Sequence, residues 1–255
     1  MFNTSTQPQT LLFVHAHPDD EALLTSGTMA RASAEGHRVV LLVATDGAAG
    51  LTSENYSESL ALTRQTELQR SAEILGVDTV ISWAHADSGL HAEQQHGFAH
   101  MEIEPLAEKL LTLIQNEKIS VLIGYDPSGG YGHPDHVHVH RVVRRAHEKV
   151  SGECSLFEAT LPREPIARVV RAAARLHLTP SGFNPHEFEH AWTPRSQITH
   201  RVNVRPFLSQ KRRAIQAHAS QAHADGTVRT LAVITHLPKP LFATLMGTEY
   251  FVKVG

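Results

Sequence analysis

The chain has 255 residues, 41% of them hydrophobic, so it can bury a sizeable core in one large α/β domain or two small ones. Its formal net charge is −3, and no block of like charge exceeds three residues, which argues against nucleic acid and anionic membrane surfaces as partners. A single cysteine, Cys154, excludes an internal disulfide framework. Because no apolar stretch has membrane-spanning length and the N-terminus lacks a signal-peptide pattern, we expect a cytoplasmic protein that does not contact membranes.

Strands and helices are predicted to alternate along the first half of the chain. A strand at 10–15 precedes a helix at 20–34, and the near-continuous apolar run at 38–45 is typical of a parallel strand buried on both faces. This strand–helix–strand order is a βαβ unit. The predicted elements that follow are a helix at 58–75, a strand at 80–83, a helix at 101–117, a strand at 120–125 and a helix at 134–149.

The second half has weaker patterns. There we expect strands at 155–159, 198–204 and 250–254, helices at 165–176 and 206–224, and a long loop at 179–194. The order of elements predicts a Rossmann-like, mostly parallel sheet flanked by helices, with a smaller C-terminal α/β portion that completes the pocket. We interpret 1–255 as a single domain, in which 1–150 form the Rossmann-like half and 151–255 the C-terminal portion.

The most informative segment, His15-Ala16-His17-Pro18-Asp19-Asp20-Glu21, follows the first predicted strand. It places side chains that bind metals or move protons at a strand-to-helix turn, where ligand crevices form in parallel sheets. Acidic residues near a helix start also favour the helix dipole. Capping needs only one carboxylate, however, and explains neither His15 nor His17. The turn therefore predicts a functional site.

A second segment of the same design, Gly129-Gly130-Tyr131-Gly132-His133-Pro134-Asp135-His136, follows the fourth predicted strand. If the two loops leave neighbouring strands, His17, Asp20 and His136 can surround one metal ion. His133 stands three residues before His136 and is an alternative ligand. Two nearby ligands and one distant ligand of nitrogen and oxygen type fit a catalytic zinc that keeps one coordination position open. Ferrous iron is the alternative metal.

These segments resemble the PIG-L/LmbE-like family of zinc-dependent N-acetylglucosaminyl deacetylases. The similarity is closest to the branch that deacetylates N-acetylglucosaminyl-inositol in mycothiol biosynthesis, and to the related mycothiol-conjugate amidases. The resemblance covers most of the chain but is weak between 151 and 197. Ala48 departs from it, because family members usually carry the glutamate of a Gly-Glu pair there. The further matches are Arg64-Gln65-Thr66-Glu67-Leu68, Ile74-Leu75-Gly76-Val77, Asp87-Ser88-Gly89 and the segment 211–221.

The resemblance assigns the metal to His17, Asp20 and His136 and leaves His133 free. Asp19, beside the metal but not on it, would then be the general base toward the attacking water. A protonated His133 would stabilise the oxyanion and protonate the leaving amine.

The remaining roles follow from the same match. Asp135 would orient the His133 imidazole, and the Tyr131 hydroxyl would reach the oxyanion. Arg64, Asp87 and His218 match positions that contact substrate or line the pocket.

Two further histidines lie near the motifs. His140 has the i,i+4 spacing of a helical zinc pair with His136, but Val137 stands where that motif needs glutamate, so we interpret His140 as structural. His15 is expected to support the ligands from behind.

The predicted function is that of a metal-dependent amidohydrolase. It would remove the acetyl group from a small N-acetylglucosamine-type substrate, such as N-acetylglucosaminyl-inositol, with Zn²⁺ or Fe²⁺ as cofactor. One alternative is an amidase that cleaves a mycothiol-type thiol conjugate. Another is a nucleotide-binding Rossmann-like module, disfavoured because the first loop is acidic and lacks Gly-x-Gly-x-x-Gly. A third is a non-catalytic metal-binding protein, disfavoured because Asp19, His133 and Tyr131 are all present. The oligomeric state is open, and a homo-oligomer is compatible with the sequence.

Overall fold

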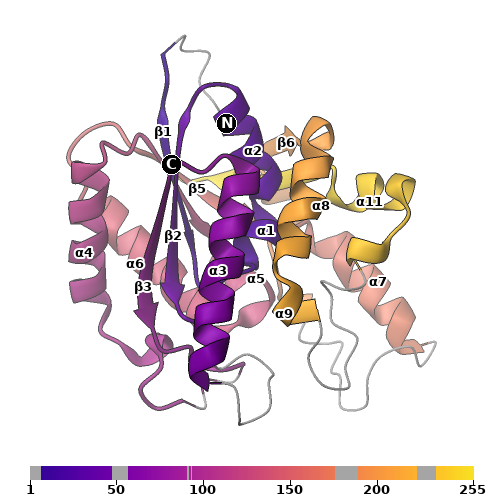
Figure 1. The fold of residues 1–255 in the computed structure, drawn as a ribbon, viewed down its shortest axis with the longest axis horizontal. Helices are drawn as coiled ribbons and strands as arrows, with labels where there is room; N and C mark the ends of the chain where they lie inside the picture. Colours follow the sequence, from indigo (N-terminus) through magenta and orange to yellow (C-terminus); the bar gives the residue numbers. More distant parts are fainter. Residues whose placement is uncertain (1–6, 48–56, 91, 93, 176–188, 223–233) are drawn as a thin grey trace.

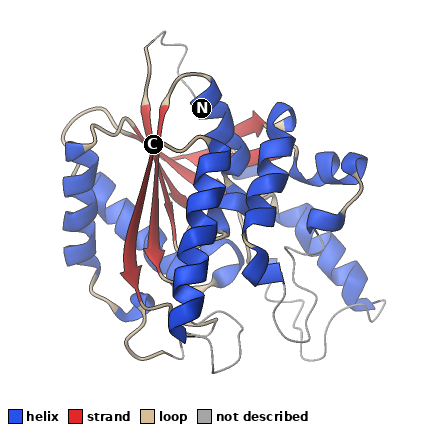
Figure 2. Cartoon of the chain, viewed as in Figure 1, coloured by secondary structure: helices blue, strands red, loops and turns tan. Residues whose placement is uncertain are grey.

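The computed structural model describes residues 7–47, 57–90, 92, 94–175, 189–222 and 234–255. Its described part contains a seven-stranded sheet in the order β3-β2-β1-β4-β5-β7-β6 (Figure 1). The first five strands are parallel, β7 is antiparallel to β5, and β6 is antiparallel to β7. Figure 2 shows helices on both sides of this sheet. The predicted mostly parallel α/β architecture is confirmed.

The strands agree closely with the sequence pattern. β1 and β2 have the predicted bounds, and the other five overlap their predicted ranges. The side chains of β1 alternate between two hydrophobic clusters, one on each face of the sheet, which explains why its sequence is apolar throughout. The strands are β1 (Thr10–His15), β2 (Arg38–Thr45), β3 (Thr79–His85), β4 (Val121–Tyr125), β5 (Ser155–Thr160), β6 (His200–Asn203) and β7 (Thr248–Lys253).

The helices form two layers. α2, α3, α8 and α11 pack on one face of the sheet, and α4 and α6 on the other (Figure 1). The helices are α1 (Asp20–Leu24), α2 (Ser26–Ala34), α3 (Ser57–Leu75), α4 (Ile103–Asn116), α5 (Gly129–Gly132), α6 (Pro134–Glu148), α7 (Arg163–Arg175), α8 (Leu208–Ala217), α9 (Ala219–Ala222) and α11 (Lys239–Met246).

The strand order reverses between β1 and β4, which lie side by side in parallel. After β1 the chain turns to the face covered by α2, and after β4 it turns to the face covered by α6. The two loops therefore separate at the carboxyl edge of the sheet, where open α/β sheets bind their ligands. Both histidine-containing motifs lie in these two loops.

Two predicted helices are interrupted. The helix predicted at 20–34 breaks at Thr25, whose hydroxyl lies 2.8 Å from His15 Nε2. The helix predicted at 206–224 starts as a single turn at Arg205–Phe207 and breaks at His218, which has φ −85° and ψ 53°. Its predicted end lies outside the described residues. The short helices α5 and α11 were not predicted, because a few residues show little periodicity.

Other expectations fall partly beyond the described part of the chain. Ala48 lies outside it, as does the predicted loop at 179–194 up to residue 188. Within the residues that are described, no helix combines the length and apolarity needed to cross a bilayer.

A buried ion pair joins the C-terminal part of the sheet to the α1–α2 junction. Lys211 Nζ lies 2.5 Å from Glu249 Oε1, and the two side chains are only 1% and 3% exposed. Lys211 also donates to the carbonyl of Leu23 at 2.9 Å. Glu249 accepts the backbone N–H groups of Gly27 and Thr28, at 2.8 and 2.7 Å, at the start of α2. These bonds compensate for the cost of burying the two charges.

Lys211→Met should therefore lower the free energy of unfolding by about 3–5 kcal/mol, because Glu249 would keep a buried charge without its counter-ion. Urea titration followed by circular dichroism measures this loss. Arg145→Met is the control, since Arg145 pairs with Glu104 and Glu148 on an exposed surface. The control should cost about 1 kcal/mol or less. Equal losses in the two variants would contradict a special role for the buried pair.

Candidate active site

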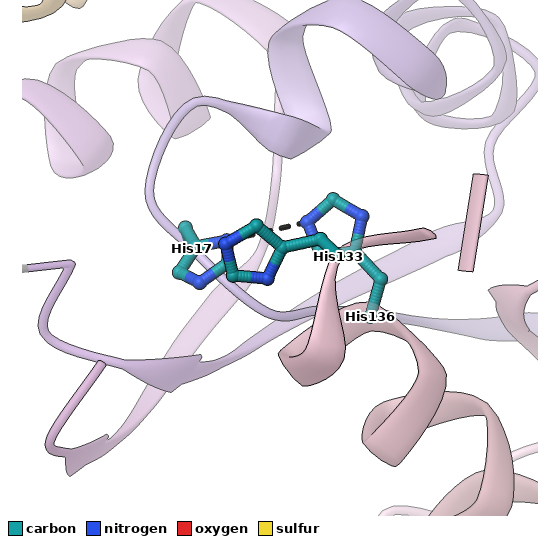
Figure 3. A group of neighbouring side chains, drawn as sticks. All are labelled: His17, His133 and His136. Carbon is teal, nitrogen blue, oxygen red and sulfur yellow. Dashed lines mark hydrogen bonds between the residues drawn. The ribbon is translucent and has the colours of Figure 1, made fainter. Parts of the chain in front are cut away.

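The two histidine-containing loops meet above the ends of β1 and β4. Figure 3 shows His17 approaching His136, with His133 beside them at the start of α6. His17 Nδ1 and His136 Nε2 are 3.3 Å apart. Residues separated by more than a hundred positions in sequence are thus brought together because their strands are neighbours.

Asp20 completes a triangle of donor atoms. Its Oδ2 lies 3.3 Å from His17 Nδ1 and 3.2 Å from His136 Nε2. Nitrogen and oxygen ligands about 2.0–2.1 Å from a tetrahedral ion are themselves separated by about 3.3 Å. The spacing of these three atoms therefore fits a metal ion.

The outer hydrogen bonds of the two imidazoles favour the same interpretation. His17 Nε2 lies 3.0 Å from Asp135 Oδ2, and His136 Nδ1 lies 3.2 Å from the carbonyl of Gly129. An ionised carboxylate and a carbonyl only accept, so these outer nitrogens carry the protons. When a metal is bound, the inner nitrogens, Nδ1 of His17 and Nε2 of His136, would therefore direct their lone pairs at the ion, as metal ligands do.

Carboxylates surround His17. Asp135 and Asp20 are in contact with it, and Asp87 Oδ1 lies 3.6 Å from its Nε2. Burial alone would lower the pKa of His17, but its contacts with these three carboxylates raise it well above its usual value. Burial likewise opposes ionisation of Asp87, yet the neighbouring His17 brings the pKa of Asp87 down to about 2. The cluster thus attracts positive charge, and protons compete with a metal as the pH falls.

Other donor groups lie close by. One ring nitrogen of His133 is within 4.8 Å of donor atoms of His17 and His136, and the group of His17, Asp87 and Asp135 meets the same limit. The assignment of His17, Asp20 and His136 as the ligands therefore stays a prediction, which the donor triangle supports.

The predicted pairing of Asp135 with His133 is wrong. The Asp135 carboxylate accepts from His17 and from the backbone N–H of Ser88, each at 3.0 Å. Only the backbone N–H of Asp135 contacts His133, donating to its Nδ1 at 3.2 Å. Burial and the neighbouring His17 and His136 lower the pKa of His133 to about 4, which opposes the protonated state that its predicted role needs. His133 is thus neutral near pH 7, with its proton on Nε2.

Asp19 occupies a strained backbone conformation, with φ 110° and ψ −27°. Its backbone N–H donates to Glu21 Oε2 at 2.9 Å. Burial and the adjacent Asp20 raise the pKa of Asp19 to about 6, against the opposing charges of Arg64 and His218. A carboxylate with this pKa can accept a proton near neutral pH more readily than an ordinary aspartate.

Tyr131 stands at the rim of the site. It is 43% exposed, and its ring centroid lies 5.2 Å from that of His136. Partial desolvation and the charges of Asp20 and Asp19 raise the pKa of its hydroxyl, which therefore stays protonated and able to donate.

The predicted substrate residues lie in different surroundings. Arg64 is buried on α3 and donates to the carbonyl of Gly47, while its buried Nε has no partner among the described residues. Asp87 lies against His17. His218 is fully buried, with Nε2 2.7 Å from Glu21 Oε1, so the prediction that it lines the pocket is wrong for this structure.

Sequence reasoning missed Tyr125. Its hydroxyl donates to Asp20 Oδ2 at 2.6 Å, and its ring stacks on His136 with centroids 4.3 Å apart. A tyrosine at the carboxyl end of an aliphatic strand was the available signal. His15 Nδ1 lies 3.3 Å from the same hydroxyl, behind the ligands as expected. His140 Nδ1 lies 3.0 Å from the carbonyl of Tyr125, which agrees with a structural role.

Trp192 was also missed, because it lies where the family resemblance is weak. Its backbone N–H donates to the carbonyl of Gly130 at 2.8 Å. Its ring covers Gly130 so closely that a Cβ there would lie 2.6 Å from the indole. Arg163 donates to the carbonyls of Ala191 and Trp192 and so holds this segment in place. Trp192 thereby fixes the backbone next to Tyr131.

Comparison with known proteins agrees with this site. The model of the PIG-L family, described as GlcNAc-PI de-N-acetylase, matches residues 12–147, which include both motifs. The 1D-myo-inositol 2-acetamido-2-deoxy-alpha-D-glucopyranoside deacetylase of Saccharomonospora viridis is 34% identical, with 95% of this chain and 94% of the relative covered. These matches define an enzyme of the deacetylase class. The chain belongs to the PIG-L family, so the resemblance seen in the sequence is confirmed.

Solved structures share the fold at lower identity. An N,N'-diacetylchitobiose deacetylase from Pyrococcus horikoshii superimposes with a TM-score of 0.63 and 19% identity, over 96% of this chain and 84% of that one. GalB, the 4-carboxy-2-hydroxymuconate hydratase of Pseudomonas putida, gives 0.63 and 16%, over 97% and 96%. Likeness at this level establishes the fold and not the reaction.

We expect His17→Ala and His136→Ala each to lose most bound metal, because each removes one corner of the donor triangle. Elemental analysis of purified, zinc-reconstituted protein measures the metal content. His140→Ala is a matched control on the same helix as His136 and should retain the metal. Full occupancy in both ligand variants would exclude the proposed triangle.

Asp19→Asn should raise the melting temperature of the metal-free protein more at pH 8 than at pH 4. The pKa of Asp19 rises from 3.8 to about 6 on folding, so ionised Asp19 destabilises the fold above that pH. Well below the unfolded pKa of 3.8 the side chain is protonated in both states, and at pH 4 most of the cost is already gone. Thermal melts with a chelator present measure the difference. A lower melting temperature for the variant at pH 8 would contradict the raised pKa.

Proposed function

We propose that this protein is a metal-dependent hydrolase that removes the acetyl group from an N-acetylglucosamine-type substrate, with N-acetylglucosaminyl-inositol as the leading candidate. The observation that carries the proposal is the donor triangle of His17, Asp20 and His136, beside the unligated carboxylate of Asp19. The relative from Saccharomonospora viridis, named for an acetamido-sugar inositol substrate, supports the substrate class. Zinc is the proposed metal and Fe²⁺ the alternative, since the donor set suits either ion.

When bound, the metal would polarise the amide carbonyl and make water acidic enough to attack near neutral pH. Asp19 accepts the proton of the attacking water on a carboxylate oxygen, and its raised pKa suits this task. The protonated Asp19 then returns this proton to the leaving nitrogen, so that acetate and a free amine are released. This role replaces the acid role predicted for His133, because a neutral imidazole is a weak acid.

His133 and Tyr131 donate hydrogen bonds to the oxyanion. Neutral His133 offers the proton on Nε2, and Tyr131 offers its hydroxyl. Donors of this kind stabilise the charge that develops in the transition state. Asp135 is assigned to orienting His17, through the contact at 3.0 Å.

Arg64 and Asp87 are the proposed substrate contacts. Asp87 uses Oδ1 toward both Gly89 and His17, which leaves Oδ2 for a sugar or inositol hydroxyl. The Nε–H of Arg64 has no partner among the described residues and is the group proposed to donate to the substrate. An acidic crevice also disfavours a nucleotide phosphate as ligand.

We further propose that the substrate is a small amino sugar and that the protein acts in the cytoplasm. A homo-oligomeric state is compatible with this function. An amidase acting on a thiol conjugate is retained as the alternative, because the family resemblance includes such enzymes.

The test is an assay of the zinc-reconstituted protein for acetate and free amine. The panel contains N-acetylglucosaminyl-inositol, free N-acetylglucosamine and a mycothiol-type thioether amide. We expect the inositol glycoside to react fastest, and Asp19→Asn to lose about 10²–10⁴-fold in kcat while keeping its metal. Faster cleavage of the thioether amide would establish the alternative. No hydrolysis of any member, or an Asp19→Asn variant with the activity of the parent, would refute the proposal.

A further inference from the structure

Glu21 lies at the centre of a buried network that ends at the backbone of Asp19. It is fully buried, and its Oε2 accepts the backbone N–H of Asp19 at 2.9 Å. Its Oε1 accepts from Ser71 Oγ at 2.6 Å and faces His218 Nε2 at 2.7 Å. Three elements, α1, α3 and the α8–α9 junction, thus contribute to a single carboxylate.

Two local distortions converge on this network. Asp19 adopts a positive φ that L-residues avoid, and the helix predicted at 206–224 breaks at His218, the residue whose side chain turns to Glu21. The positive φ of Asp19 is a conformation that an L-residue keeps only where the surrounding structure enforces it. The unfavourable backbone of Asp19 and the helix break at His218 both adjoin Glu21. Departures from local conformational preference that occur together in this way indicate a functional constraint.

The network contacts the proposed base and not the proposed metal ligands. The outer atoms of His17 and His136 are held by Asp135 and Gly129, and Asp20 is held by Tyr125. Among the described residues, the Glu21 carboxylate bonds to Asp19, Ser71 and His218. Disturbing the network should therefore move the base while leaving the metal in place.

We infer that Glu21, held by Ser71 and His218, is a positioning residue that fixes Asp19 in its strained conformation and so aims its carboxylate at the attacking water. This inference rests on the proposed role of Asp19 as the base. His218, which the sequence suggested as a pocket residue, acts through Glu21 from behind the site. Ser71 and His218 both bond to Glu21 Oε1 and so hold the carboxylate in one orientation.

The test is a double-mutant cycle between the network and Asp19. His218→Ala should lower kcat by about 10–100-fold, with KM and metal content unchanged, because misplacing a supported group costs this much. Ser71→Ala should give a smaller loss in the same direction. In an Asp19→Asn background neither variant should lower kcat further, since the group they position is gone.

A matched control separates positioning from stability. Thr28→Val also removes one hydroxyl bonded to a buried glutamate, at 2.5 Å from Glu249 Oε2, on the same side of the sheet. It should leave kcat per folded enzyme unchanged. If His218→Ala does not fold, His218→Gln, which keeps a donor near the position of Nε2, and Ser71→Ala complete the cycle.

The outcomes are distinct. Equal losses of kcat in the parent and Asp19→Asn backgrounds, or loss of metal in His218→Ala, would overturn the inference. So would unchanged kcat in both Ser71→Ala and His218→Ala, or in Ser71→Ala alone where His218→Ala does not fold. A parent enzyme without hydrolase activity would instead refute the proposed function, and that result is obtained before any network variant is made.

Discussion

The site depends on the close approach of three carboxylates, Asp20, Asp87 and Asp135, to one buried imidazole, His17. Charges of one sign gathered away from water repel one another unless a positive charge lies among them. A proton on His17 or a divalent cation beside it can supply that charge. Asp20 follows β1 and Asp135 follows β4, and these two strands are paired. The two carboxylates therefore reach His17 from elements on opposite faces of the sheet. The buried carboxylates around His17 therefore favour the binding of a proton or a cation at this point.

The sequence predicted the parts of the fold that depend on local pattern. β1 and β2 were found at their predicted bounds because fully buried parallel strands are apolar at every position. The break at Thr25 was not predictable, because Glu249, far away in sequence, stabilises the new helix start. The partner of Asp135 was misassigned for a similar reason: a motif shows neighbours in sequence, whereas the contact with His17 crosses between two loops.

The same architecture is shared by proteins with different chemistry, as the structural likeness to both a deacetylase and a hydratase illustrates. The sheet supplies a crevice where its strand order reverses, and the loops supply the reacting groups. In this chain the proposed metal ligands come from two loops that match the family model, while Trp192 comes from a segment beyond that match. The proposed metal ligands and the residue that fixes the backbone beside Tyr131 therefore come from different parts of the chain.

The packing of Trp192 on Gly130 has a consequence for how relatives diverge. The indole occupies the volume that any side chain at position 130 would need, and the positive φ of 70° at Gly130 further restricts replacement. Evolution can therefore enlarge position 130 only together with a smaller residue at position 192. Such linked substitutions would appear as covariation between positions 130 and 192, and would change the backbone beside Tyr131 without changing the proposed metal ligands.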